Sequence, residues 1–349
     1  MAYSTIPKGS LYMDTKLYTG NNSSLNTISG IPFAPDLIWI KARGAATDHV
    51  LFDTVRGVYK SISSNDTTVE NNNTNQLQTF TSDGWTMGDL DTSNAATTFV
   101  SWNWKAGTAV SGTTTGSGTG KAYSGSVNTT SGFSIITYLG NGSAGHTIPH
   151  HLGVTPEIII TKRLSDAGEW YVYSPVMGNT KHMRLNRTGA EDTANTIWNN
   201  TSPTSSVFTV GTNGDVNGNN NPIIAYSFNS VQGYSKFGSY VGNGNTDGTF
   251  IYTGFKPSFL LIKNTSSATN WHMYDNKRLG YNVDNNVLRP NLSDAELTND
   301  DLDILSNGFK LRRVTDALAT NGDTYIYMAF AENPFVATSG TNAIPVTAR

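Results

Sequence analysis

The sequence contains no cysteine among its 349 residues. Disulfide frameworks, thiolate zinc sites and cysteine nucleophiles are therefore excluded, and the redox compartment stays undetermined. Charged residues are also scarce, at 14% of the chain, and the net charge is −3. Such a chain lacks the basic surface that electrostatic binding to nucleic acid or to an anionic membrane requires. No apolar run approaches the ~18 residues of a membrane span, and Met1–Lys8 shows no secretory signal pattern.

The composition is polar without being charged. Hydrophobic residues make up 37% of the chain and aromatic residues 11%, and the 34 glycines stand among many serines, threonines and asparagines. This differs from the low hydrophobicity and high net charge of disordered chains, so we expect the protein to fold. At roughly 100–200 residues per domain, the length predicts two or three domains.

Three segments share an ordered pattern, which indicates an internal repeat. Each contains an apolar run that starts at a proline and ends six residues later at a lysine, and an aromatic residue follows eleven residues after that lysine. A turn of the form Tyr-x-Gly-Asn-Gly, or Tyr-x-Gly-Asn-Asn in the first copy, precedes each run. The lysines are Lys41, Lys162 and Lys263, and the later aromatic residues are Phe52, Tyr173 and Tyr274.

Within each copy, short apolar runs alternate with Gly, Asn, Asp and Pro clusters, which predicts β-strands. Runs such as 37–40 are apolar at every position, as is typical of strands covered on both faces. We expect an all-β fold of three tandem antiparallel β-sandwich repeats, jelly-roll or concanavalin-like. The expected repeats are 1–106, 126–233 and 234–349, the last with a C-terminal tail, and 107–125 is expected to be a flexible Gly/Ser/Thr-rich linker. Small sandwiches on short linkers predict an extended molecule.

Signals for catalytic or metal chemistry are weak. His146, His150 and His151 surround a proline, which prevents the helical spacing that a metal pair on one face would need. We therefore expect no metal, no cofactor and no catalytic residue. The repeated lysines are interpreted as strand ends that emerge into solvent. Ser293-Asp-Ala-Glu296 has the form of a capping box and predicts one short helix.

Aromatic side chains offer the remaining candidate contacts, because rings on a β-sandwich surface can stack on sugars. Most tryptophans lie in strand-like runs or at repeated positions that predict burial. Trp198 and Trp102 are less constrained. Trp198 stands among turn formers in 196–201, so it is the candidate for an exposed ligand or receptor contact, with Trp102 as the second.

Several motifs resemble one family of proteins. They are the repeated Tyr-x-Gly-Asn-Gly turn, the strands ending at Lys162 and at Tyr173, and the junction Gly233-Tyr-Ser-Lys-Phe-Gly-Ser-Tyr240. Together they resemble the repeat-containing virion proteins, often labelled tail fibre, of bacteriophages that infect aquatic bacteria. The resemblance covers nearly the whole chain and is strongest over 131–334. It implies a structural part of a virus particle with no established catalysis, and it transfers no site residue.

The leading hypothesis is therefore a non-enzymatic virion component, either a tail or head fibre or a capsid decoration protein. Its expected partners are other virion proteins, further copies of itself and a host surface glycan, with no nucleic acid and no membrane insertion. Two alternatives stay open. One is a lectin-like glycan-binding module, and the other is a glycan-degrading enzyme on a concanavalin-like scaffold, which would need paired carboxylates across a cleft.

Overall fold

A computed structural model describes residues 4–278, 282, 285–299 and 301–334. Strands account for 44% of the chain and helices for 5%, so the expected all-β class is confirmed. The helices are single turns: η1 (Gly9–Leu11), α1 (Asp91–Asn94), α2 (Asn195–Trp198) and α3 (Gly214–Asn217). None of the helices in this described part is long and apolar enough to span a membrane. The expected C-terminal tail, from 335 onward, lies outside the described residues.

Unit 1 combines a large and a small antiparallel sheet. The large sheet has the order β1-β9-β3-β4-β5-β6, and the small sheet has the order β2-β8-β7. The strands are β1 (Met13–Thr19), β2 (Asn26–Ile28), β3 (Leu37–Ala42), β4 (Val50–Asp53), β5 (Lys60–Ser63), β6 (Asn71–Asn72), β7 (Leu77–Thr81), β8 (Gly84–Met87) and β9 (Thr98–Trp104).

Unit 2 repeats the strand order of the large sheet and adds two strands to one edge of it, whereas its small sheet has its third strand on the opposite edge. Its large sheet runs β10-β12-β13-β20-β15-β16-β17-β18, and its small sheet runs β11-β14-β19. The strands are β10 (Thr108–Thr113), β11 (Thr115–Gly116), β12 (Ala122–Asn128), β13 (Phe133–Leu139), β14 (His146–Pro149), β15 (Ile158–Arg163), β16 (Trp170–Tyr173), β17 (Lys181–Arg184), β18 (Asp192–Thr193), β19 (Val207–Val210) and β20 (Pro222–Phe228).

Unit 3 has a four-stranded sheet of order β21-β29-β23-β24 and a small sheet of order β22-β28-β27. A two-stranded ribbon, β25-β26, continues from β24 through a bridge between Met273 and Leu288. The strands are β21 (Ser235–Val241), β22 (Phe250–Tyr252), β23 (Pro257–Asn264), β24 (His272–Asp275), β25 (Asn285–Val287), β26 (Leu297–Asn299), β27 (Leu302–Leu305), β28 (Gly308–Leu311) and β29 (Thr324–Ala331).

The three large sheets agree in register as well as in strand order. In each, the lysine-bearing strand pairs with the last long strand of its unit. Four positions before the lysine, its strand lies opposite an aromatic residue of that last strand. Lys41, Lys162 and Lys263 lie opposite Val100, Ile224 and Ile326, and these aromatic residues are Trp104, Phe228 and Phe330. Residues at matching sequence positions therefore occupy matching places in the three sheets.

Each large sheet is covered on both faces. One face packs on the small sheet of its own unit, and this gives each unit a separate sandwich core. The other face joins a core shared by all three units. The strand Leu37–Ala42 is accordingly buried at every position, as its continuous apolar run predicted.

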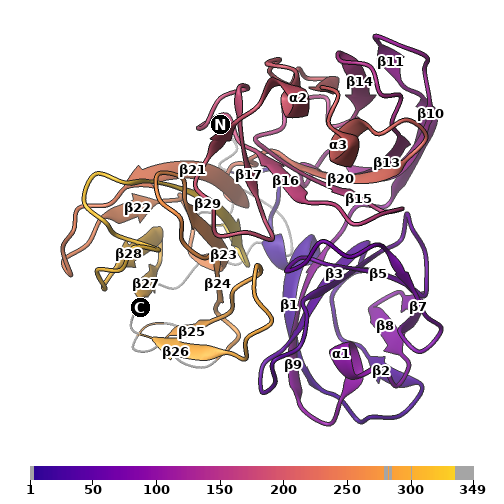
Figure 1. Cartoon of the computed structure of the whole chain (residues 1–349). Helices are drawn as coiled ribbons and strands as arrows, with labels where there is room; N and C mark the ends of the chain where they lie inside the picture. The colour runs from indigo at the N-terminus through magenta and orange to yellow at the C-terminus, as the bar shows by residue number, and fades with distance from the viewer. Residues whose placement is uncertain (1–3, 279–281, 283–284, 300, 335–349) are drawn as a thin grey trace.

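The shared core lies where the three units meet, and Figure 1 shows the three lobes around this common centre. Trp104, Phe228 and Phe330 come from equivalent positions, and each ring contacts the other two with centroids 5.8–6.4 Å apart. Such a triangle of equivalent side chains marks a pseudo-threefold axis. The ends of the described chain also meet, because the Ser10 N–H donates to the Glu332 carbonyl at 2.9 Å.

Two expectations about organisation are wrong. The segment expected to be a flexible linker forms β10 and β11, and β10 pairs with β12 along six residues. Its threonines and valine favour extended backbone, and strand pairing needs no apolar side chain when the strand lies at a sheet edge. The extended shape is also wrong, because each large sheet has a second apolar face that it buries against the other units.

The expected helix at Ser293-Asp-Ala-Glu296 does not form either. The segment precedes β26, and the Glu296 N–H donates to the carbonyl of Arg43 in unit 1 at 2.9 Å. A contact with another unit thus replaces the local capping interaction that the sequence suggested.

Candidate functional site at the junctions of the three units

Three equivalent backbone hydrogen bonds connect the units in a closed cycle. Each runs from the N–H of a glutamate to the carbonyl two residues after a repeated lysine. The bonds are Glu70 to Leu164 at 3.0 Å, Glu191 to Thr265 at 2.9 Å and Glu296 to Arg43 at 2.9 Å. They lead from unit 1 to unit 2, from unit 2 to unit 3 and from unit 3 back to unit 1. The junction between units 3 and 1 therefore has the same backbone hydrogen bond as the junctions between units that are consecutive in the chain.

The repeated lysines lie beside these bonds, and all three are fully buried. Lys162 donates to the carbonyl of Thr67 in unit 1 at 3.3 Å, and Lys263 donates to the carbonyl of Thr188 in unit 2 at 3.1 Å. Lys41 donates to the carbonyl of Ala45 at 3.0 Å within its own unit. The expectation that these lysines emerge into solvent is wrong, because backbone carbonyls at the junctions accept from their ammonium groups.

Burial changes the proton affinity of these lysines. It lowers the pKa of Lys41 and of Lys162 to about 8, although nearby carboxylates oppose the effect. Burial lowers the pKa of Lys263 further, to about 7, and no carboxylate opposes it there. The junction between units 2 and 3 is therefore the one most sensitive to proton binding near neutral pH.

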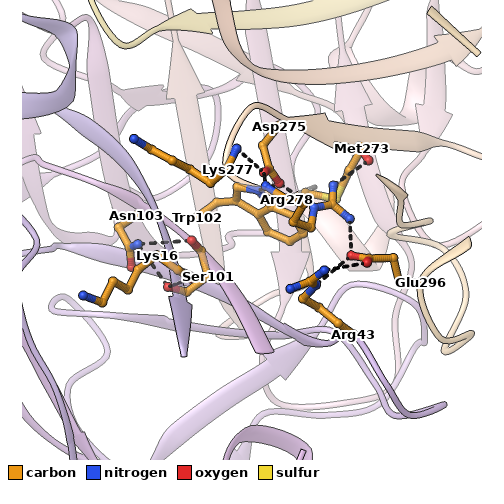
Figure 2. Close-up of polar contacts among 10 residues, drawn as sticks. All are labelled: Lys16, Arg43, Ser101, Trp102, Asn103, Met273, Asp275, Lys277, Arg278 and Glu296. Carbon is orange, nitrogen blue, oxygen red and sulfur yellow. Dashed lines mark hydrogen bonds and ion pairs between the residues drawn. The ribbon is translucent and has the colours of Figure 1, made fainter. Parts of the chain in front are cut away.

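At the junction of units 3 and 1, a buried arginine organises a network of charges, shown in Figure 2. Arg278 contacts the Asp275 carboxylate at 2.7 Å and the Glu296 carboxylate at 3.0 Å, and it donates to the carbonyl of Met273 at 3.1 Å. Its guanidinium also lies 5.6 Å from the ring centroid of Trp102 in unit 1. Every face of this buried cation thus has a partner, which a buried charge requires.

Two residues of unit 1 complete the network. The indole N–H of Trp102 donates to Asp275 at 3.0 Å, and Arg43 holds Glu296 through two bonds of 2.9 and 2.8 Å. The hydrogen bonds that Arg43 donates to the Glu296 carboxylate raise the pKa of Arg43, and burial opposes this effect. We call Trp102, Asp275, Arg278, Glu296 and Arg43 the 3–1 clamp.

The junction of units 1 and 2 carries an equivalent network, the 1–2 clamp. Arg56 contacts Asp53 at 2.6 Å and Glu70 at 3.3 Å and donates to the Leu51 carbonyl at 2.9 Å. The Tyr226 hydroxyl of unit 2 donates to Asp53 at 2.9 Å, in the role that Trp102 plays at the other junction. Burial raises the pKa of Tyr226 well above its ordinary value, and the neighbouring Asp53 charge adds to the effect.

The third junction has uncharged residues, two methionines and a serine, at the same positions. Ser174 and Met177 stand where the clamps have the aspartate and the arginine, and Met328 stands where they have Trp102 or Tyr226. All three side chains are buried. One structural plan therefore accepts either a satisfied ion pair or an apolar filling, as expected when desolvation offsets most of the attraction of a buried ion pair.

The core in which the three units meet is tightly packed. The cavity on the pseudo-threefold axis has a volume of only about 20 Å³, and apolar side chains from all three units line it. The larger hollows lie at the surface, among them one of about 480 Å³ between units 2 and 3. The buried charges at the junctions therefore contact residues of the neighbouring unit and do not line the central cavity.

Both predicted contact residues lie in cores. Trp198 is 1% exposed and packs edge-on against Tyr173 and Phe208, and Trp102 is fully buried. The prediction of exposed ligand contacts is therefore wrong for both. Turn formers surround Trp198 in the sequence, but its side chain belongs to helix α2 and closes the sandwich core of unit 2.

Sequence reasoning missed the clamps, although a signal for them was present. An Asp-x-x-Arg pattern begins twelve residues after Lys41 and after Lys263, and Ser174 and Met177 stand at those positions after Lys162. An aspartate–arginine pair that recurs at a fixed number of residues after a repeated buried strand indicates that the pair makes the same buried contact in both units. Which unit supplies the remaining partners could not be deduced, because it depends on the closed arrangement.

The chain belongs to the family described as a domain of unknown function, DUF7483, whose sequence profile matches residues 8–334. The match spans all three units as one domain. It begins just before η1 and ends three residues after β29. Comparisons with curated proteins and with solved structures found no match.

Proposed function

We propose that this chain is a non-enzymatic structural component of a bacteriophage virion, a tail or head fibre or a capsid decoration protein, and that it serves host attachment. The motifs that resemble phage virion proteins support this function. The observation that carries the proposal is where the three repeated lysines lie. The three repeated lysines are fully buried and donate to backbone carbonyls at the junctions. Lysines enclosed in this way cannot reach a receptor or a substrate, which favours a scaffold.

The closed arrangement supports a particular kind of position in the particle. One chain presents three similar lobes around a pseudo-threefold axis. Partners that share rotational symmetry can each contact one lobe in an equivalent way. The end of a trimeric fibre and a threefold position of a capsid are such partners. The compact shape favours a fibre tip or a decoration over a fibre shaft.

The proposal is tested on virions of the phage whose genome encodes the chain. We expect mass spectrometry of purified particles to find the protein at a fixed copy number, and deletion of its gene to remove it and to lower host adsorption at least tenfold. Complementation with the intact gene is the control. Particles of unchanged composition after deletion would contradict the proposal, and so would release of reducing ends from host polysaccharide by the purified chain.

A further inference from the structure

An exposed aromatic pair distinguishes unit 3 from the other two units. Phe250 and Tyr252 on β22 are 45% and 54% exposed, and Ile251 between them points into the sandwich core. Two large rings therefore stand side by side on the outer face of the small sheet. Apolar side chains that cluster at the surface are typical of binding surfaces, and this pair is the starting point of the inference.

The fold does not require aromatic residues at these positions. Ile28, Ile148 and Ile251 are equivalent, because they pair with Trp85, Phe208 and Phe309 in the three small sheets. The residues that flank the isoleucine in unit 1 are Thr27 and Ser29, and those in unit 2 are Thr147 and Pro149. In units 1 and 2 the equivalent strand therefore forms with smaller, non-aromatic side chains on both sides of the isoleucine.

The surroundings of the two rings keep them in place and accessible. Tyr252 lies opposite Gly308 on β28, where a Cβ would lie 2.0 Å from the carbonyl oxygen of Ile251, so the two strands approach closely beside the rings. The amine of Lys236 donates to the Tyr252 carbonyl at 2.7 Å and lies 5.4 Å from the centre of its ring. Lys236 thus supports one side of Tyr252.

Tyr252 also borders the surface pocket of about 480 Å³ between units 2 and 3. This volume lies within the range of small-ligand pockets. Glu157, Gln232 and Lys236 supply polar side chains to its wall. The backbone N–H of Ser230 donates to the Glu157 carboxylate at 3.0 Å, and its hydroxyl donates to the same oxygen, so this carboxylate is fixed in position.

We propose that Phe250, Tyr252 and this pocket form a binding site for an oligosaccharide chain built of uncharged hexoses. A hexose presents an apolar face of C–H groups that stacks on an aromatic ring, whose face carries partial negative charge. Its hydroxyl groups need donors and acceptors, which the pocket wall provides. Two residues along a strand span about 6.6 Å, so the two rings can contact one sugar chain.

The size of the site favours a saccharide over a protein partner. A stable protein interface needs about 800 Å² from each partner, with a broad apolar centre. The site has two exposed rings beside a polar hollow, which suits a narrow chain. This inference goes beyond the proposed function, because the isolated protein should bind the saccharide wherever it is located.

The test uses the full chain and a panel of defined probes, cellotetraose, maltotetraose, mannotetraose and chitotetraose, together with a glycan array. The variant Phe250→Thr/Tyr252→Ser adopts residues found at the same positions in unit 1. Because both side chains are exposed, it should fold as the wild type does, which circular dichroism checks. The matched control is Leu25→Ser in unit 1, which removes another exposed apolar side chain.

We expect the wild type to bind at least one saccharide, the double variant to bind it at least tenfold more weakly, and the control to bind it unchanged. The inference is overturned if the folded wild type binds no probe and no array glycan. Equal binding by the double variant would also overturn it. Loss of incorporation into virions by the double variant, with no saccharide binding by the wild type, would identify the rings as a protein contact instead.

Discussion

Two substitutions can replace the ion pair of the 3–1 clamp with the residues that occupy the equivalent positions at the junction of units 2 and 3. Asp275→Ser and Arg278→Met place Ser and Met at the positions equivalent to Ser174 and Met177. Made separately, each change leaves a buried charge without its main partner. Made together, they remove both charges. Glu296 keeps its two bonds from Arg43 in every variant.

The side chains of Asp275 and Arg278 are 0% and 1% exposed. Removing one partner of a buried ion pair costs about 3–5 kcal/mol, so each single variant should lose that much stability. We expect Arg278→Met to lie at the lower end, because Asp275 still accepts from Trp102 and from two backbone N–H groups. In the double variant the Trp102 N–H and the backbone N–H groups of residues 277 and 278 lose the Asp275 carboxylate. The unpaired indole N–H costs about 1–3 kcal/mol. The new serine can accept from the N–H of residue 277, as Ser174 accepts from the Val176 N–H.

Urea unfolding followed by far-ultraviolet circular dichroism measures the free energy of unfolding of the four proteins. The double variant should be more stable than at least one single variant, with a coupling energy of about 3 kcal/mol or more. Arg187→Met, at an exposed ion pair with Glu169, is the control and should change stability by less than about 1 kcal/mol. Additive losses in the double variant would refute the interpretation of the junctions as interchangeable ionic and apolar fillings.

Three further predictions concern buried residues. Trp198→Ala should lower the free energy of unfolding, measured in urea, by about 3–5 kcal/mol, because the indole fills a core. The saccharide affinity of the remaining folded protein should stay unchanged, and a specific loss of binding would contradict this. Lys263→Met should reduce the dependence of stability on pH. The pKa of Lys263 falls from 10.5 to about 7 on folding, so the unfolded chain binds more protons between these values and stability rises with pH across that window. The wild-type slope between pH 7 and pH 9 should exceed that of the variant by on the order of 1 kcal/mol per pH unit, whereas Lys121→Met at the surface should keep the wild-type slope. Gly140→Ala should cost about 2 kcal/mol or more, because its Cβ would lie 2.3 Å from the Gly218 carbonyl oxygen, and Gly189→Ala, whose Cβ meets nothing within 4 Å, should be neutral.

The class of the fold and the matching of its parts were predictable from local pattern. The continuous apolar runs before the repeated lysines indicated strands covered on both faces, and β3 is buried at every position. The role of the Tyr-x-Gly-Asn-Gly turn was predicted in part. Its second glycine has positive φ at Gly142 and at Gly244, as expected for a tight turn. Its first glycine is needed because another backbone segment lies against it, as at Gly140.

The arrangement of the units was not predictable in the same way. A strand that is apolar on both faces indicates that both faces are buried. The sequence pattern does not show which part of the molecule packs on the second face. The sequence pattern places each lysine at the end of its own strand. In the structure Lys162 and Lys263 each donate to one carbonyl of that strand and to one carbonyl of the preceding unit. The aromatic residues selected for exposure, Trp198 and Trp102, are buried, and the exposed pair on β22 becomes evident only when equivalent strands are compared.

Small-angle X-ray scattering of the purified chain tests the closed arrangement most directly. Three units packed around one axis predict a radius of gyration of about 20 Å for a compact chain of this length. Three sandwiches of about 110 residues in an extended row would give about 30 Å, from the same scaling for each sandwich and their separation. A value near 20 Å at infinite dilution is the expected result, and a value near 30 Å would contradict the closed cycle of units.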